Sequence, residues 1–196
     1  MYTVVGAVKS RAFRVMWMLE EMGIAYDHNP AAPRSDEAKK FNPSGKIPVL
    51  VDGDDVLTDS VAIMTYLGDK HGKLTAPAGT LARARQDALT FWLIDEFDAI
   101  LWAAAKHSFI FPEESRVPEI KDSLKSEFVR SANLLAERIE GPYLCGDSMT
   151  HADILATHCI NWSIGAGFPR VNDKLGNWAK TVRDRTAFKA TLAKGD

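Results

Sequence analysis

Residues 44–60 read SGKIPVLVDGDDVLTDS and predict a β-hairpin with a proline near its start. An Asp-Gly turn separates a first strand at 47–51 from a second strand at 56–58. Proline cannot donate a hydrogen bond to a sheet, so Pro48 favours an edge, a first position or a bulge. We therefore expect part of the hairpin backbone to stay open. The hairpin ends at Asp59, where the pattern changes to that of a helix.

Short strand and helix patterns alternate through the first 72 residues. Strands are predicted at 1–5, 24–28, 47–51 and 56–58, and helices at 10–22, 36–41 and 61–72. The order β-α-β-α-β-β-α predicts an α/β domain over residues 1–72.

A Pro- and Gly-containing linker at 73–79 precedes a part of the chain with helical patterns only. These helices are expected at 80–110, 118–139, 150–164, 173–184 and 187–194. The chain thus divides into an α/β domain, a linker and an all-α domain over 80–196. Thr150-x-x-Asp153 is a capping-box pattern that begins one of these helices, and we assign it a folding role only.

Composition narrows the class of protein. The 196 residues are 46% hydrophobic, enough for one large core or two small ones, and the net charge of -2 argues against nucleic-acid binding. No apolar run reaches the length of a membrane span, and the N-terminus has no signal-peptide pattern. Cys145 and Cys159 form no CxxC, which fits a reducing cytoplasm. His151 and His158 build no zinc ligand set, so we expect no metal.

Taken in order, the motifs resemble those of the soluble glutathione transferases. Residues 42–48 read NPSGKIP, similar to the N-P-x-G-[QK]-[VI]-P segment of that family, and an acidic residue and a serine follow the hairpin at 59–60. The helical half is similar in GDSMTHADI (146–154) and NWAKTVRDRTAFK (177–189). The resemblance covers essentially the whole chain. It implies a thioredoxin-like N-terminal domain, an all-α C-terminal domain and glutathione as co-substrate.

The resemblance also implies how glutathione, a tripeptide, would bind at the hairpin. The Ile47–Pro48 peptide bond would be cis, and Ile47 would offer its N–H and C=O to the cysteinyl unit as a neighbouring strand does. An ordinary proline at the start of a strand is the alternative. Lys46 and Arg34 would face the glycine end of the peptide, and for each the alternative is a solvated surface charge.

At the end of the hairpin, the resemblance implies a clamp for the γ-glutamyl unit. Ser60 begins a helix whose first N–H groups favour an anion, so its hydroxyl and N–H would donate to the carboxylate. Asp59 would accept from the ammonium group of the same unit. The alternative is that one of the two residues only caps the helix.

The chemistry requires a donor that stabilises a thiolate. Lowering a thiol pKa by about two units from about 8.5 takes roughly 2.7 kcal/mol, the size of one charge-assisted hydrogen bond with help from a helix start. Ser10, followed by Arg14 four residues later, resembles the serine-type classes, although Arg11 stands where the family usually has a proline. The alternative role for Ser10 is the N-cap of helix 11–22. Because both cysteines lie in the helical half, we expect no disulfide-exchange activity.

The electrophile would be held by apolar side chains of the helical half. Trp102 and Phe109 share one predicted helix face, and Trp162 is a further candidate, with core packing as the alternative for each. The leading function is a cytoplasmic, homodimeric glutathione S-transferase that conjugates small apolar electrophiles in detoxification. A glutathione-dependent isomerase or dehalogenase, and a non-catalytic glutathione-binding or partner-binding protein, remain as alternatives.

Overall fold

The computed structural model describes residues 1–195, which divide into two compact units. Unit 1 comprises Met1–Thr80 together with the described residues from Arg183 onward, and unit 2 comprises Leu81–Val182. The division near residue 80 follows the expected linker. At the other end it differs from the expected all-α domain, because the last helix belongs with the α/β unit.

Unit 1 contains the predicted four-stranded mixed sheet, in the order β2-β1-β3-β4. Its strands are β1 (Tyr2–Val5), β2 (Tyr26–Asn29), β3 (Val49–Asp52) and β4 (Asp55–Thr58). β2 runs parallel to β1, whereas β3 is antiparallel to both β1 and β4. The predicted hairpin is confirmed. Its first strand begins at Val49, directly after Pro48, because proline has no N–H for the ladder.

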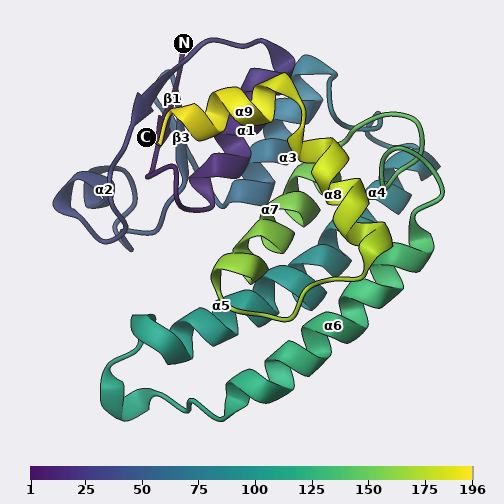
Figure 1. Cartoon of the computed structure of the whole chain (residues 1–196). Helices are drawn as coiled ribbons and strands as arrows, with labels where there is room; N and C mark the ends of the chain where they lie inside the picture. Colours follow the sequence, from purple (N-terminus) through teal and green to yellow (C-terminus); the bar gives the residue numbers. More distant parts are fainter. Residues whose placement is uncertain (196) are drawn as a thin grey trace. The chain divides into compact units, whose positions relative to one another are not determined.

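The described residues of unit 1 also form the helices α1 (Ala12–Met22), α2 (Asp36–Phe41), α3 (Ser60–His71) and α9 (Thr186–Ala193). α1 ends at Gly23, which has a φ of 68° and forms the predicted left-handed C-cap. The Phe188 ring of α9 lies 5.2 Å from the ring of Phe13 and 5.0 Å from that of Trp17, both on α1. These aromatic contacts explain why α9 lies along α1 in Figure 1 and belongs to unit 1.

Unit 2 is built of helical segments. They are α4 (Leu81–Leu93), η1 (Ile94–Ala99), α5 (Ile100–Ala105), η2 (Lys106–Ile110), η3 (Glu113–Ser115), α6 (Ile120–Arg138), α7 (His151–Gly165) and α8 (Asp173–Arg183), whose last residue is grouped with unit 1. The Phe128 ring forms edge contacts with Phe97 at 5.0 Å and with Phe168 at 5.4 Å. This aromatic row forms part of the core of the unit.

The helix expected at 80–110 is interrupted by two π-helical segments, η1 and η2. Hydrogen bonds in a π-helix run from i to i+5, so residues beyond such a segment are rotated away from the face that α-helical spacing predicts. Trp102 is accordingly half-buried, whereas Phe109 is 68% exposed. Within the described part of the chain, none of the helices combines the length and hydropathy that a membrane crossing requires.

Candidate functional site

The start of α3 is organised by Asp59. Its Oδ1 accepts from the N–H groups of Val61 at 2.9 Å and Ala62 at 3.1 Å, so Asp59 is the N-cap. Ser60 is the first residue of the helix, in line with the expectation that it begins there. Every hydrogen bond that the described residues make to the Asp59 carboxylate goes to Oδ1. Asp59 thus fills the role that the N-cap alternative gave it, and Oδ2 stays available to a ligand.

Asp59 also has an unusual backbone conformation. Its φ of 69° is positive, a region that residues other than glycine rarely adopt. Residues held in such conformations cluster at ligand-binding sites, where the surrounding structure maintains them. The side chain itself is exposed, whereas the neighbouring Ser60 is only 2% exposed.

Ser60 is contacted by a buried arginine that sequence reasoning did not place there. Arg14 of α1 is 1% exposed, and its guanidinium donates to Ser60 Oγ at 3.2 Å. The sequence analysis used Arg14 only for its spacing from Ser10. A charged residue among the apolar positions of α1 was the available signal, but the partner lies 46 residues away and no local pattern identifies it.

Ser10 lies in the loop between β1 and α1 and is half-buried. Its hydroxyl donates to the carbonyl of Ala7 at 2.6 Å and accepts from the N–H of Ala12 at 3.0 Å. The N-cap of α1 is Arg11, so the alternative that made Ser10 the N-cap is not met; Ser10 stands one residue earlier and accepts from the first N–H of the helix. A second role toward a thiolate requires its O–H to turn from the Ala7 carbonyl to the sulfur.

Gly6 brings the Ser10 loop close to the proline segment. A Cβ atom on Gly6 would lie 2.8 Å from Ala12 Cβ and 3.1 Å from Ile47 Cβ, and the φ of Gly6 is 145°. The first turn of α1 and residue 47 thus meet across this glycine. The Ile47–Pro48 bond is cis, as the resemblance implied. Among the hydrogen bonds of residues 1–195, none uses the N–H or C=O of Ile47, so this backbone is open.

The residues before Ile47 form a tight loop around Asn42. The Asn42 side chain donates to the carbonyl of Lys46 at 3.0 Å and accepts from the N–H of Ser44 at 3.1 Å. Gly45 has a φ of 66°, and its carbonyl accepts from the N–H of Arg34 at 2.8 Å. The structure thus brings the backbones of Arg34 and Lys46 to one loop, and it leaves both side chains exposed.

The candidate electrophile-binding residues all lie in unit 2, on three different elements. Trp102 is on α5, Phe109 on η2 and Trp162 on α7. The ring of Trp162 contacts His158, one turn earlier on the same helix, with centroids 6.4 Å apart. Their role in holding an electrophile stays a prediction.

The capping box predicted at the start of α7 is confirmed. Asp153 Oδ2 accepts from the N–H of Thr150 at 2.8 Å and from its hydroxyl at 3.2 Å. Oδ1 accepts from the N–H of Leu144 at 2.8 Å, which ties the preceding loop to the helix. Burial raises the pKa of the Asp153 carboxyl to about 6, because desolvation outweighs these hydrogen bonds.

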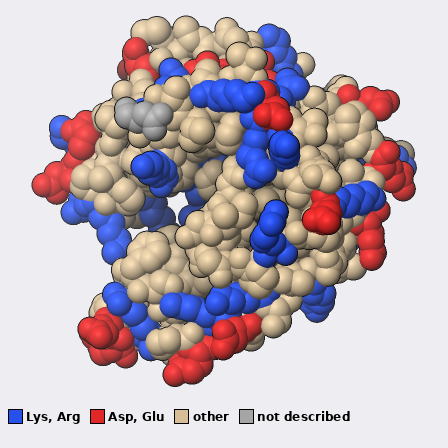
Figure 2. All heavy atoms as spheres, in the orientation of Figure 1, with Lys and Arg blue, Asp and Glu red and all other residues tan. Residues whose placement is uncertain are grey.

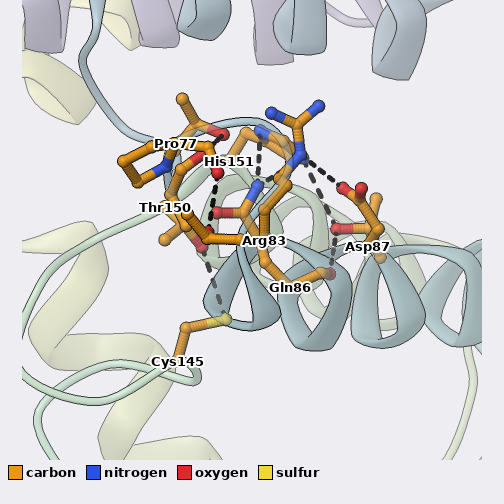
Figure 3. Close-up of polar contacts among 11 residues, drawn as sticks. Pro77, Arg83, Gln86, Asp87, Cys145, Thr150 and His151 are labelled. Atoms are coloured by element: carbon orange, nitrogen blue, oxygen red, sulfur yellow. Dashed lines mark hydrogen bonds and ion pairs between the residues drawn. The ribbon is translucent and has the colours of Figure 1, made fainter.

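A buried polar group lies beside this cap, between α4 and α7. His151 and Gln86 are both fully buried, and the amide nitrogen of Gln86 lies 3.4 Å from His151 Nε2. In Figure 3 they lie close to Arg83, which pairs with Asp87 at 2.8 Å. These contacts join two helices of one unit, and we assign them a folding role.

Both cysteines belong to unit 2. Cys145 is exposed and its Sγ lies 3.8 Å from the hydroxyl of Thr150, while Cys159 is buried. Residues 1–195 contain no group of three or more His, Cys, Asp or Glu side chains suited to a metal ion. Basic and acidic side chains both appear on the face drawn in Figure 2, in line with the small net charge.

Comparison with known proteins finds similarity to glutathione S-transferases. The family model for the glutathione S-transferase N-terminal domain matches residues 10–70. Human glutathione S-transferase theta-1 is 30% identical over 157 residues, 76% of this chain and 65% of that protein. Dichloromethane dehalogenase from Methylorubrum extorquens is 27% identical over 177 residues, 78% of this chain and 58% of that protein. The chain spans less than two thirds of the length of the curated relatives it matches.

Solved structures have the same fold. Glutathione transferase URE2P6 from Phanerochaete chrysosporium, in complex with oxidized glutathione, matches with a TM-score of 0.82 at 22% identity, covering 99% of this chain and 96% of that chain. The family-model match spans the described site residues of α1, the proline segment and the start of α3. This chain belongs to the glutathione S-transferase family.

Proposed function

We propose that this protein is a glutathione S-transferase that adds the glutathione thiolate to small apolar electrophiles. The proposal rests on two polar groups of unit 1, the Ile47 backbone and Asp59 Oδ2, that make no hydrogen bond among the described residues. The backbone of Ile47 has no hydrogen-bond partner among residues 1–195, and Asp59 Oδ2 is free of the capping bonds that Oδ1 accepts. Open backbone beside a strand suits an extended peptide, and a carboxylate at a helix start suits the zwitterionic γ-glutamyl end.

In this proposal each part of glutathione has its own partner. The cysteinyl unit pairs with the N–H and C=O of Ile47, and the γ-glutamyl carboxylate accepts from Ser60. The ammonium donates to Asp59 Oδ2, and the glycyl carboxylate lies toward Lys46 and Arg34. The exposure of the last two side chains and the shared loop of their backbones support this placement.

Ser10 is the proposed donor to the sulfur. Its O–H turns from the Ala7 carbonyl toward the thiolate and stabilises the negative charge, while the thiol proton leaves to solvent. The sulfur then forms its bond to the electrophile with its own electron pair, and the leaving group departs with the electron pair of the broken bond. In the helical unit, Trp102, Phe109 and Trp162 are the proposed apolar contacts of the electrophile.

The test is a serine-to-alanine pair. Ser10→Ala is expected to lower kcat for conjugation of a chloronitrobenzene about 10-fold or more at a nearly unchanged KM for glutathione, as for a group that acts in the transition state. Ser35→Ala is the matched control, because Ser35 Oγ also donates to a carbonyl three residues earlier (Ala32, 2.7 Å) and accepts from a helix N–H (Ala38, 3.1 Å). Equal kcat losses in the two variants would rule out a chemical role for Ser10.

A second candidate function is glutathione-dependent dehalogenation, favoured by the similarity to dichloromethane dehalogenase. Both reactions start from the same thiolate, and only the leaving group differs. Release of halide from dihalomethanes, measured beside conjugation of chloronitrobenzene, separates the two. We further propose a cytoplasmic homodimer that acts in detoxification without a metal. Light scattering after size exclusion measures the oligomeric state, and activity in the presence of a chelator tests the metal.

A further inference from the structure

Arg14 and Ser60 form a buried polar pair beneath the start of α3. Their exposed fractions are 1% and 2%, and Arg14 donates to Ser60 Oγ at 3.2 Å. We propose that Arg14 is a positioning residue, which directs the Ser60 hydroxyl at the γ-glutamyl carboxylate and adds a positive charge behind it. This inference rests on the proposed function.

The direction of the hydroxyl follows from the chemistry of the pair. Arginine can only donate hydrogen bonds, so the oxygen of Ser60 must accept from it. A serine hydroxyl has one proton and two lone pairs. With one lone pair committed to Arg14, the proton of Ser60 is available to an acceptor on the other side of the oxygen. The carboxylate of the γ-glutamyl unit is such an acceptor.

The charge of Arg14 acts at the same place. The first N–H groups of α3 already favour an anion through the helix dipole. A guanidinium buried within hydrogen-bond reach of the first residue of that helix is screened by solvent far less than a surface charge. Arg14 therefore strengthens the attraction of this helix start for a carboxylate.

A capping role does not account for the pair, because α3 has its cap already. Asp59 accepts from the N–H groups of Val61 and Ala62, so the helix start is stabilised without the Ser60 side chain. The hydrogen bond from Arg14 therefore fixes the Ser60 hydroxyl, which takes no part in capping α3.

The experiment compares two ligands across variants of the full chain. Dissociation constants are measured by calorimetry for glutathione and for its analogue that lacks only the γ-glutamyl carboxylate, γ-aminobutyryl-cysteinyl-glycine. The preference for glutathione is the ratio of the two constants. For wild type it is expected to be about tenfold or more, the value of one charge-assisted hydrogen bond. Ser60→Ala is expected to lose most of that preference.

Arg14→Met is expected to reduce the preference to near the Ser60→Ala value, because glutathione loses affinity while the analogue does not. Arg14→Gln, which can still donate to Ser60 but carries no charge, is expected to fall between that value and wild type. It serves as the second variant should Arg14→Met fail to fold. Arg83→Met is the matched control, since Arg83 is also buried, at 9% exposure, but pairs with Asp87 in unit 2.

A purely structural role for Arg14 predicts a different result, in which affinity for both ligands falls by the same factor and the preference is unchanged. That outcome in either folded Arg14 variant overturns the inference. Failure of the wild type to bind glutathione at all refutes the proposed function itself, and the wild-type titration alone reveals it. Wild-type binding with a lost preference in Ser60→Ala but not in the Arg14 variants refutes this inference alone.

Discussion

Arg185 donates to both carboxylate oxygens of Glu21, each at 2.7 Å, and so joins two segments that are 164 residues apart. The indole N–H of Trp17 donates to the same carboxylate at 3.0 Å. This pair lies at the start of α9, next to the aromatic contacts of Phe188. The end of the chain is therefore part of the unit that carries the proposed glutathione site.

Breaking this ion pair is expected to destabilise unit 1. The Glu21 side chain is 5% exposed, so Arg185→Met leaves a nearly buried carboxylate without its main partner. Removing one member of a buried pair costs about 3–5 kcal/mol, and we expect about 2–3 kcal/mol because the Arg185 side chain is 37% exposed. The measurement is the free energy of urea unfolding, followed together with glutathione binding.

Lys189→Met is the control for that experiment. Lys189 pairs with Asp184 at 3.4 Å, and both side chains are more than 60% exposed, so the loss is expected to stay below about 1 kcal/mol. An equal loss in the two variants would contradict the assigned role of the Arg185–Glu21 pair.

Gly45→Ala is expected to distort the loop that carries Lys46 and Ile47. A Cβ atom on Gly45 would lie 2.7 Å from Arg34 Cα, closer than real contacts allow. Gly53 has a similar positive φ, 62° against 66° for Gly45, but a Cβ atom on Gly53 would meet nothing within 4 Å. Gly53→Ala is therefore the control. We expect about 1–2 kcal/mol of destabilisation for Gly53→Ala and more for Gly45→Ala, which alone weakens glutathione binding. Thermal unfolding and calorimetry measure both effects, and identical glutathione affinities would refute the expectation.

The sheet and the start of α3 were predictable because their signals are local. The Asp-Gly turn and the alternating strands define the hairpin over 47–58, and the Asp59-Ser60 step marks the helix start. The bond between Arg14 and Ser60 and the return of α9 to α1 depend on contacts between residues far apart in sequence. The π segments also escaped prediction, because no residue pattern distinguishes a single wide turn from an α-helical one.

The carboxyl of Asp153 is expected to make stability depend on pH. Its pKa in the folded chain, about 6, is higher than the unperturbed value of 3.8, so the folded state binds a proton more tightly than the unfolded state. The contribution of this group to stability therefore falls as pH rises from about 4 to about 6, and it is constant above that range. The change is about 2–3 kcal/mol at most.

Asp153→Asn isolates that contribution, since the variant lacks the titrating group. We expect the difference in unfolding free energy between wild type and Asp153→Asn to be larger, in favour of wild type, at pH 4 than at pH 7. Other groups titrate alike in both proteins and cancel in the difference. Urea unfolding at half-unit pH steps measures it. A flat difference from pH 4 to pH 7 would show that burial does not control this carboxyl.

Asp59→Asn separates capping from ligand binding. Asparagine caps a helix about as well as aspartate and tolerates the φ of 69°, so the unfolding free energy should change by less than about 1 kcal/mol. The charge that would bind the ammonium group is lost, so glutathione affinity should fall about tenfold or more. Asp36→Asn, which removes an exposed acid from the first turn of α2, is the control. Calorimetric binding equal to that of wild type would mean that Asp59 only caps α3, because its free oxygen would then contribute nothing to the ligand.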